Sequence, residues 1–468
     1  MISLTRWKKL LVVLLLGTAT AIMSPAQTFK TLLDFNGTNG ATPVYTSLLQ
    51  GRDGNLYGTT AGGGSNGSGT VFKITAAGKL TTLYSFCSQA NCGDGLAPQG
   101  GLVLGRDGNF YGTTSQRGAN GDFGTVFKIT PRGTLTTLHS FNLADGAYPL
   151  AGLVQGRDGD FYGATSSGPT SNHGTLFRIT SAGSLTTLHV FDGTDGSQPL
   201  NTLIQGADGN LYGTTPYGAG YGTIFKITPS GRLTILHRFN VTDGAFPYCA
   251  LLQAADRNFY GTTSGGGDTS KCYNRGCGTI FKITPNGTLT TLHNFDSTEG
   301  ATPFAGLIQA TDGNFYGTTY GGGNDGGWGV VFKITTSRVL TTLHSFDGND
   351  GGQPFGPLAQ ATNGNLYGTA TSGLGIASRG TIFDIATGFR PFVSFVSNSG
   401  KVGQVAGILG QGFTGTTGVS FNGAPAQFIV KSATFITATV PAGATTGFVK
   451  LITPSGRLTS NVRFQVVP

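Results

Sequence analysis

The sequence predicts an all-β protein built from a repeated unit. Of its 468 residues 79 are Gly, more than twice the usual share of about 7%. Of its 21 acidic residues, Glu299 is the only Glu. Glu favours helices whereas Asp and Gly favour turns, so many short strands joined by tight turns are expected. Hydrophobic residues make up 38% of the chain, enough to bury a large core, which excludes a disordered chain.

Residues 1–26 have the pattern of a secretory signal peptide. Three basic residues precede the apolar stretch Leu10–Met23, and Ser24 and Ala26 supply the small residues of a cleavage site. The alternative is a retained anchor, but the continuous apolar run Leu10–Leu16 is short for a membrane span. We therefore expect an exported protein, extracellular, at the cell surface or periplasmic, with no transmembrane segment in the mature chain.

The charge of the mature chain excludes one class of partner. Without the signal peptide the chain has 26 basic and 21 acidic residues, a net charge of +5. This is mild for a chain of this length and supports no nucleic-acid partner.

One unit recurs seven times, every 48–56 residues. Its most regular step is Tyr-Gly-Thr or Tyr-Gly-Ala, at Tyr57, Tyr111, Tyr162, Tyr212, Tyr260, Tyr316 and Tyr367. An Asp-Gly or related turn precedes the step, and a Gly-rich loop and two further strands follow it. In the second unit the expected strands A to D lie near Gly101–Leu104 and at Asn109–Thr114, Gly124–Thr130 and Leu135–Phe141. Four antiparallel strands per unit predict a β-propeller blade.

The two ends of the repeat predict how the ring closes. Strand D occurs once alone at the start, at Phe29–Phe35, and the last copy ends with strand C at Gly380–Ile385. The N-terminal strand is therefore expected to complete the last blade. This predicts a seven-bladed β-propeller over residues 27–389 with no open sheet edge.

The repeat motifs resemble a known family. Asp-Gly-Asn-(Phe/Leu)-Tyr-Gly-Thr-Thr, Gly-Thr-(Val/Ile)-Phe-Lys-Ile-Thr and Leu-Thr-Thr-Leu-His-x-Phe are similar to the GloVer tandem repeat of secreted bacterial proteins, which have varied choice-of-anchor tails. The resemblance covers roughly residues 29–389 and implies no particular reaction. This chain departs from the anchored members at Val462–Pro468, which is neither a hydrophobic nor a basic tail.

Residues 390–468 predict a second domain. Short alternating runs separated by Gly and Pro are typical of a small β-sandwich. The segments Val419–Gly423 and Ile436–Pro441, with Gly410-x-Gly412-Phe413, resemble an IPT/TIG immunoglobulin-like module. That resemblance implies a spacer or a binding appendage rather than a catalyst.

The titratable residues predict no catalytic set. Five of the six His occupy one position of strand D, one per blade, so they diverge and are expected to be structural rather than metal ligands: His139, His189, His237, His293 and His344. No cofactor is expected, although the pairs Asp192 with Asp195 and Asp347 with Asp350 are candidates for structural Ca²⁺. The sequence contains no zinc-protease motif or phosphate loop.

The five cysteines predict disulfides in an exported chain. Cys87 and Cys92 bracket one insertion, and Cys272 and Cys277 bracket another. Cys249 is left over; it is either buried and free or a partner of the Cys272 loop.

Loop variation predicts the functional face. A–B and C–D turns lie on one face of a propeller and are uniform here, so we call it the plain face. B–C and D–A loops lie on the other face and vary, and we call it the variable face; function concentrates in such loops. The residue before the strand C Gly differs in every copy. The candidate ligand-binding residues are Phe123, His173, Tyr221, Tyr273, Tyr320, Trp328 and Arg379. Their mixture of aromatic and polar groups suits carbohydrate, and neutral drift of exposed loops is the alternative.

Three functions are compatible with this pattern. The first is a non-catalytic binding protein whose variable face binds an extracellular glycan or another surface ligand. The second is a polysaccharide lyase or hydrolase that uses the same face. The third is a structural or adhesive scaffold for other proteins. The scarcity of Glu and the missing catalytic set favour a protein that is not an enzyme.

Overall fold

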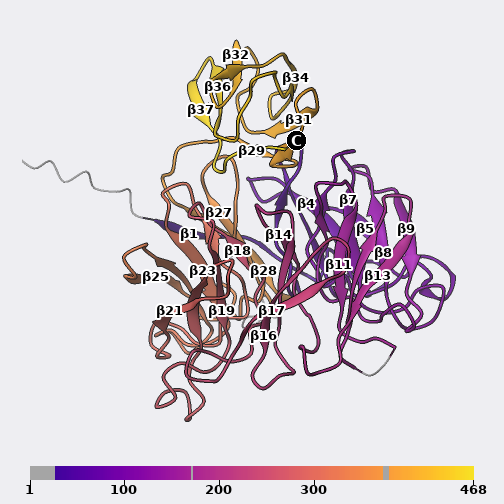
Figure 1. The fold of residues 1–468 in the computed structure, drawn as a ribbon, viewed down its shortest axis with the longest axis vertical. Coiled ribbons are helices and arrows are strands. Elements are labelled where there is room, and N and C mark those ends of the chain that lie inside the picture. The colour runs from indigo at the N-terminus through magenta and orange to yellow at the C-terminus, as the bar shows by residue number, and fades with distance from the viewer. Residues whose placement is uncertain (1–26, 170–171, 373–378, 468) are drawn as a thin grey trace, which may run out of the picture.

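The computed structural model describes residues 27–169, 172–372 and 379–467. Within these ranges it contains seven four-stranded antiparallel sheets, which are the blades of a β-propeller, and a second β-domain (Figure 1). The predicted signal peptide, residues 1–26, lies outside the described part of the chain. No helix within the described part is long and apolar enough to cross a membrane.

Each blade runs from a short inner strand A to an outer strand D. The first four blades are β2 (Leu49–Gln50), β3 (Leu56–Thr60), β4 (Thr70–Ile74) and β5 (Leu80–Ser85); β6 (Val103–Leu104), β7 (Phe110–Thr114), β8 (Thr125–Ile129) and β9 (Leu135–Ser140); β10 (Val154–Gln155), β11 (Phe161–Thr165), β12 (Thr175–Ile179) and β13 (Leu185–Val190); β14 (Ile204–Gln205), β15 (Leu211–Thr215), β16 (Thr223–Ile227) and β17 (Leu233–Arg238). Blades 5 and 6 are β18 (Leu252–Gln253), β19 (Phe259–Thr263), β20 (Thr279–Ile283) and β21 (Leu289–Asn294); β22 (Ile308–Gln309), β23 (Phe315–Thr319), β24 (Val330–Ile334) and β25 (Leu340–Ser345). A single 3₁₀ turn, η1 (Ala90–Cys92), lies after blade 1 in the described ranges.

Blade 7 combines the two ends of the repeat. It consists of β26 (Ala359–Gln360), β27 (Leu366–Ala370), β28 (Thr381–Ala386) and the N-terminal strand β1 (Thr28–Asp34). β1 pairs antiparallel with β28, from Thr28 opposite Ala386 to Asp34 opposite Thr381. The predicted seven-bladed ring closed by the N-terminal strand is therefore confirmed.

The Gly of the Tyr-Gly-Thr step has a packing role in strand B. A Cβ on Gly58 would lie 2.6 Å from the ring of Phe72 in strand C and 3.0 Å from Leu48. Such distances are well below van der Waals contact, so only Gly lets the Phe ring cross over the strand. This explains why the step recurs in every blade.

Adjacent blades share one backbone hydrogen bond at all seven seams. The residue before the Pro of each D–A segment donates its N–H to the carbonyl ahead of strand C in the preceding blade, over 2.7–2.9 Å. The donor and acceptor pairs are Thr42 with Arg379, Ala97 with Ser68, Tyr148 with Phe123, Gln198 with His173, Phe246 with Tyr221, Thr302 with Cys277, and Gln353 with Trp328. All seven donors have φ between 54° and 57°. This left-handed conformation costs a non-Gly residue about 1–2 kcal/mol, and the seam bond offsets that cost.

The plain face has a second set of seam contacts made by strand A glutamines. Each Gln accepts the backbone N–H of the preceding blade's A–B turn over 2.8–3.1 Å and donates to a carbonyl of its own turn; the residues are Gln50, Gln155, Gln205, Gln253, Gln309 and Gln360. Blade 2 has Leu104 at this position, and there Arg52 of blade 1 donates to the carbonyl of Arg106 over 2.8 Å instead. The seams are thus bonded on both faces.

The second domain consists of two four-stranded sheets around one core. One sheet has the order β29 (Ser394–Phe395), β31 (Val405–Leu409), β35 (Phe435–Thr439), β34 (Phe428–Ser432). The other has the order β33 (Ala424–Pro425), β32 (Gly418–Phe421), β36 (Val449–Thr453), β37 (Gly456–Thr459), and β30 (Ser399–Gly400) pairs with β38 (Gln465–Val466). Ile408, Phe413, Val419, Ile436 and Leu451 are buried between the sheets. The IPT/TIG resemblance stays a prediction.

This domain lies on the plain face of the propeller (Figure 1). Arg52, in the A–B turn of blade 1, stacks over the ring of Phe435 with 4.7 Å to its centroid. Thr434 donates to the carbonyl of Arg52 over 2.7 Å, and Arg106 of blade 2 donates to Ser397 over 3.2 Å. Because the plain face is covered here, the variable face is the open side of the ring.

The A–B turns carry a repeated Asp–Tyr–cation arrangement. In blade 5, Asp256 accepts hydrogen bonds from Asn258, Tyr260 and Lys282, the last over 2.9 Å. Burial alone would raise the pKa of Asp256, but these hydrogen bonds outweigh it and lower the pKa to about 2. Strand C lysines such as Lys282 and Lys333 therefore stabilise the turns.

Blade 7 exchanges the charges of this arrangement. Asn363 takes the place of the turn Asp and donates to Tyr367, while Asp384 takes the place of the strand C cation and accepts from Asn365 over 3.2 Å. Lys30 of β1 lies opposite Asp384. Burial raises the pKa of Asp384, and Asn365 and Lys30 counteract part of this rise. The carboxylate has thus moved from the turn to the strand, where the closing strand supplies the cation.

We predict that Asp256→Asn removes part of the acid sensitivity of the fold. The folded pKa lies below the unfolded value of about 3.9, so this carboxylate stabilises the fold above about pH 4 and ceases to do so as the pH falls through about 2. The side chain is 40% exposed, so we expect an effect of about 1 kcal/mol rather than the full shift. Urea unfolding at pH 7 and pH 2 measures it. Asp325→Asn, in an exposed loop, is the control; an Asp256→Asn deficit that persists unchanged at pH 2 contradicts the assignment.

Candidate functional site

Eight aromatic side chains form a continuous series on the variable face, which we call the aromatic track. They are Tyr45, Tyr217, Tyr221, Phe246, Tyr248, Phe304, Tyr320 and Phe355. Tyr217 and Tyr221 belong to the B–C loop of blade 4 and Tyr320 to that of blade 6; the others flank the Pro that leads into strand A of blades 1, 5, 6 and 7. The loops of five blades therefore contribute to one surface.

The inner part of the track is a packed group of rings. Phe304 and Phe355 stack with centroids 4.5 Å apart and an interplanar angle of 4°. The ring of Tyr45 packs edge-on against Phe355 at 4.8 Å, and Tyr248 packs against Phe304 at 5.1 Å. Tyr320 contacts both Phe rings. These are favourable edge-to-face and offset geometries, so the group is a preformed aromatic surface.

The outer part of the track extends from Tyr248 toward the rim. Tyr217 lies 5.9 Å from Tyr248 and 6.0 Å from Phe246, and Tyr221 lies 6.1 Å from Phe246, between ring centroids. Tyr217 is 39% and Tyr221 43% exposed, high values for tyrosines in a propeller whose repeat tyrosines are buried. The outer part therefore offers accessible ring surface to a ligand.

The phenol groups of Tyr45 and Tyr248 are neutral hydrogen-bonding groups. Tyr217 and Tyr248 share a hydrogen bond between their hydroxyls. Burial, with a smaller contribution from Tyr217, raises the pKa of Tyr45 to about 12, and burial together with Tyr217 raises the pKa of Tyr248 further. The track can therefore stack against a ligand and exchange hydrogen bonds with it, without charge.

A cavity of about 270 Å³ lies beside the inner part of the track. Tyr45, Phe304 and Phe355 border it, and its walls come from the inner strands, or the segments that lead into them, of all seven blades. Its position is therefore the central channel of the propeller.

Two comparisons of sequence address the family of the chain. The Gloeobacter/Verrucomicrobia repeat matches residues 16–221 and again residues 201–427, which together span most of the chain. The chain belongs to this repeat family. No curated protein matches it.

Solved structures with similar coordinates are remote from this repeat protein. The extracellular domain of a proposed hybrid two-component system from B. thetaiotaomicron is 11% identical, with a TM-score of 0.49 over 95% of this chain and 60% of that one. The repeat protein thus spans less than two thirds of that relative. An auxiliary nutrient binding protein from Bacteroides ovatus is 13% identical, covering 77% and 76% of the chains, with a TM-score of 0.44. The PQQ-bound aldose sugar dehydrogenase from Streptomyces coelicolor is 15% identical, covering 77% and 99%, with a TM-score of 0.41.

The structure brings two of the seven sequence candidates together. Tyr221 and Tyr320 belong to the aromatic track, at its outer end and in its inner part respectively. Five further residues of the track were not predicted from the sequence: Tyr45, Phe246, Tyr248, Phe304 and Phe355. What these residues share in the sequence is a position within two residues of the repeat Pro. That position indicates a common surface only when the segments leading into strand A are known to converge on the channel.

His173 and Arg379 lie at seams, away from the track. His173 Nδ1 lies 2.9 Å from Ser197 Oγ in the next D–A segment. Arg379 donates to the carbonyl of Asn36 over 3.0 Å. Each side chain joins neighbouring blades rather than facing the channel.

The other three candidates are dispersed. Phe123 packs against the core between blades 2 and 3, and Trp328 lies over Gly352, where a Cβ would be 2.8 Å from its ring. Tyr273 is 99% exposed. Five of the seven residues that precede the strand C Gly are candidates and a sixth is Cys277, yet the backbone bond repeated at every seam uses only their carbonyls. The side chains at this position are therefore free to differ.

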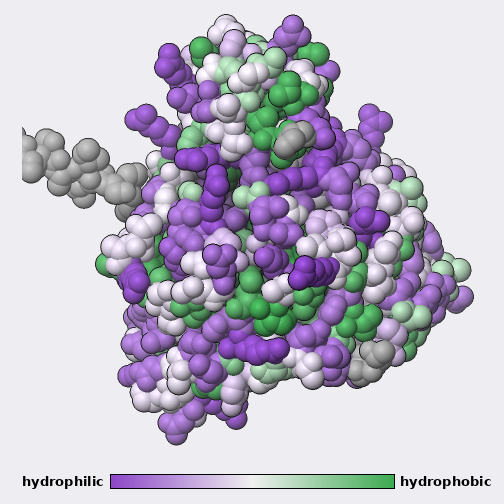
Figure 2. All heavy atoms as spheres, viewed as in Figure 1, coloured by the Kyte–Doolittle hydropathy of each residue, from purple (hydrophilic) through white to green (hydrophobic). Residues whose placement is uncertain are grey.

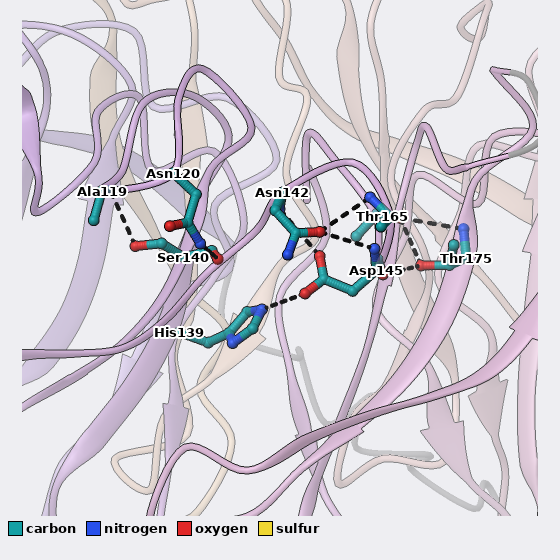
Figure 3. A network of polar contacts seen from close by, with 9 residues as sticks. Ala119, Asn120, His139, Ser140, Asn142, Asp145, Thr165 and Thr175 are labelled. Carbon is teal, nitrogen blue, oxygen red and sulfur yellow. Dashed lines mark hydrogen bonds and ion pairs between the residues drawn. The ribbon is translucent and has the colours of Figure 1, made fainter.

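The strand D histidines form local pairs with carboxylates six residues later. Figure 3 shows His139 pointing to Asp145 at 2.8 Å, with Asp145 in the D–A turn. The other pairs are His189 with Asp195 at 2.7 Å, His237 with Asp243 at 3.0 Å, His344 with Asp350 at 2.6 Å, and His293 with Glu299. Blade 1 has Tyr84 with Asp94, and blade 7 has Leu33 with Asn39. In blade 7, where the His is absent, the carboxylate is absent as well, which indicates a structural role for the pair.

The same pairs account for the Ca²⁺ candidates. Asp195 and Asp350 are engaged by histidines, and Asp192 accepts the backbone N–H groups of Thr194 and Asp195. Within the described residues no group of three His, Cys, Asp or Glu side chains is arranged to hold a metal ion.

Two disulfides are present in the loops. Cys87 is bonded to Cys92, and Cys272 to Cys277. Cys249 is a buried free thiol beside strand A of blade 5, and burial raises its pKa to about 11.

We predict that the His–carboxylate pair is interdependent. His189→Leu leaves the half-buried Asp195 without its partner and should cost about 1–2 kcal/mol of unfolding free energy. The double variant His189→Leu with Asp195→Asn reproduces the natural Leu33 and Asn39 of blade 7 and should recover at least half of that loss. A double-mutant cycle by urea unfolding measures the coupling. Additive effects of the two changes would show that the pair has no mutual role.

Proposed function

We propose that the protein is an exported, non-catalytic binding protein whose variable face binds carbohydrate. The observation that carries the proposal is the aromatic track, which combines exposed tyrosine rings at its outer end with neutral hydroxyls near the channel. Pyranose rings stack on aromatic faces and exchange hydrogen bonds with such hydroxyls. A rigid ring of blades presents this surface with little cost of ordering on binding.

The chemistry around the track supports binding rather than catalysis. Hydrolysis of a glycosidic bond usually requires two carboxyl groups about 5–9 Å apart on either side of the bond. The aromatic track contains none, and the described residues that line the adjacent cavity include no Asp or Glu. Export is supported by the two disulfides, since such bonds persist in oxidising compartments.

The series of rings also favours an extended ligand. Tyr217 and Tyr221 are followed inward by Phe246, Tyr248 and Phe304, so a chain of sugar units could contact several rings in turn. On the side of the molecule shown in Figure 2, hydrophobic residues lie in groups among hydrophilic ones.

We predict that the purified protein binds polysaccharide on a glycan array and that binding depends on the outer track. Tyr217→Ala and Tyr221→Ala should each weaken binding about tenfold, corresponding to about 1.4 kcal/mol for a lost stacking contact. Isothermal titration with the best array ligand gives the dissociation constants.

Tyr273→Ala is the matched control, because Tyr273 is an exposed tyrosine outside the track. It should leave binding unchanged. Failure to bind any glycan, or equal losses in all three variants, contradicts the proposal. Depolymerisation of the ligand by the pure protein would instead establish an enzyme.

A further inference from the structure

The channel cavity differs in chemistry from the track that borders it. Its walls are mainly apolar, with side chains that include Leu49, Leu102, Val103, Leu153 and Ala250. Four residues among those that line it carry polar side chains: Tyr45, Ser47, Asn201 and Thr202. None of the described lining residues is charged.

The cavity is large enough for a single ring with substituents. Its volume is about 270 Å³, and apolar cavities of about 150 Å³ already bind benzene. The volume therefore suits a small molecule or the terminal group of a larger one.

The lining selects against sugars and ions. A hexose carries five hydroxyls, and a mainly apolar lining with four polar side chains would leave part of them unpaired, at about 1–3 kcal/mol for each unpaired group. A charged group would lose its hydration without gaining a partner of opposite charge, which costs more. A neutral ring with one hydroxyl matches the lining, because Ser47 and Thr202 lie among apolar walls.

Access to the cavity is from the variable face. Leu49 also lines a second cavity of about 190 Å³, whose other walls include Phe395 and Leu409 of the C-terminal domain. That domain therefore stands over the plain-face end of the channel. On the opposite side Tyr45, Phe304 and Phe355 border the channel cavity, and burial raises the pKa of Tyr45 to about 12, as expected for a poorly hydrated mouth.

We propose that the central channel binds a neutral, mainly apolar one-ring molecule that carries a hydroxyl, of the class of phenol and benzyl alcohol. Ring and walls make apolar contact, and the hydroxyl bonds to Ser47 or Thr202. This site goes beyond carbohydrate binding on the outer track and does not depend on it.

Benzyl alcohol is the probe, with benzoate and glucose as comparisons, titrated into the full protein by saturation-transfer NMR. We expect saturable binding of benzyl alcohol, with benzoate and glucose at least tenfold weaker. Ala250→Leu, which fills the cavity, should weaken benzyl alcohol at least tenfold. Ala255→Leu, on an exposed A–B turn of the same blade, should have no effect.

A second variant covers the case in which Ala250→Leu does not fold. Ser47→Ala combined with Thr202→Val keeps the shape of the cavity and removes both hydroxyls, so it should weaken benzyl alcohol at least threefold. No saturable binding, benzoate binding as tight as that of benzyl alcohol, or full binding by a folded cavity variant overturns the proposal. Glycan binding is measured separately, with Tyr217→Ala as the variant that weakens it. A failure of benzyl alcohol binding can therefore be distinguished from a failure of glycan binding.

Discussion

The whole ring depends on a single backbone hydrogen bond that is repeated at every seam between blades. Its donor is the residue before the repeat Pro, held at φ near 55°, and its acceptor is the carbonyl ahead of strand C. Because the bond uses only backbone atoms, the acceptor residue can be Ser68 in one blade and Trp328 in another. The scaffold is therefore invariant while the side chains along each seam are free to differ, which is the arrangement that a binding surface on a rigid scaffold requires.

In blade 7, changes in one member of a repeated contact are matched by changes in its partner. Leu33 and Asn39 replace the His–carboxylate pair where the N-terminal strand closes the ring, and Asn363 and Asp384 exchange the charges of the A–B turn in the same blade. The contacts of blade 7 thus fit a blade that is built from both ends of the repeat region. The five His–carboxylate pairs similarly stabilise the D–A turns. The aromatic track has no such role in a turn, and it is therefore the proposed binding surface.

Much of the fold could be predicted from the sequence. The repeated motifs give four strands for each blade, and the strand D that the last copy lacks occurs at the N-terminus as Phe29–Phe35. The left-handed residue before each Pro could not, since residues in that position normally adopt extended conformations. The track was missed for a geometric reason. Tyr248, Phe304 and Phe355 are far apart in the sequence, and only the convergence of inner strands around the channel brings them together. Tyr221 and Tyr320 were identified because they lie in loops of irregular length.

Hydrogen–deuterium exchange of the seam amides tests the central claim most directly. If the seam bonds hold the ring, the N–H groups of the seven donors, such as Ala97 and Gln198, exchange only with global unfolding and do so at one common rate. The amides of the exposed B–C loops, such as that of Tyr273, should exchange orders of magnitude faster. Seam amides that exchange at loop rates, or blade by blade at different rates, would contradict the account.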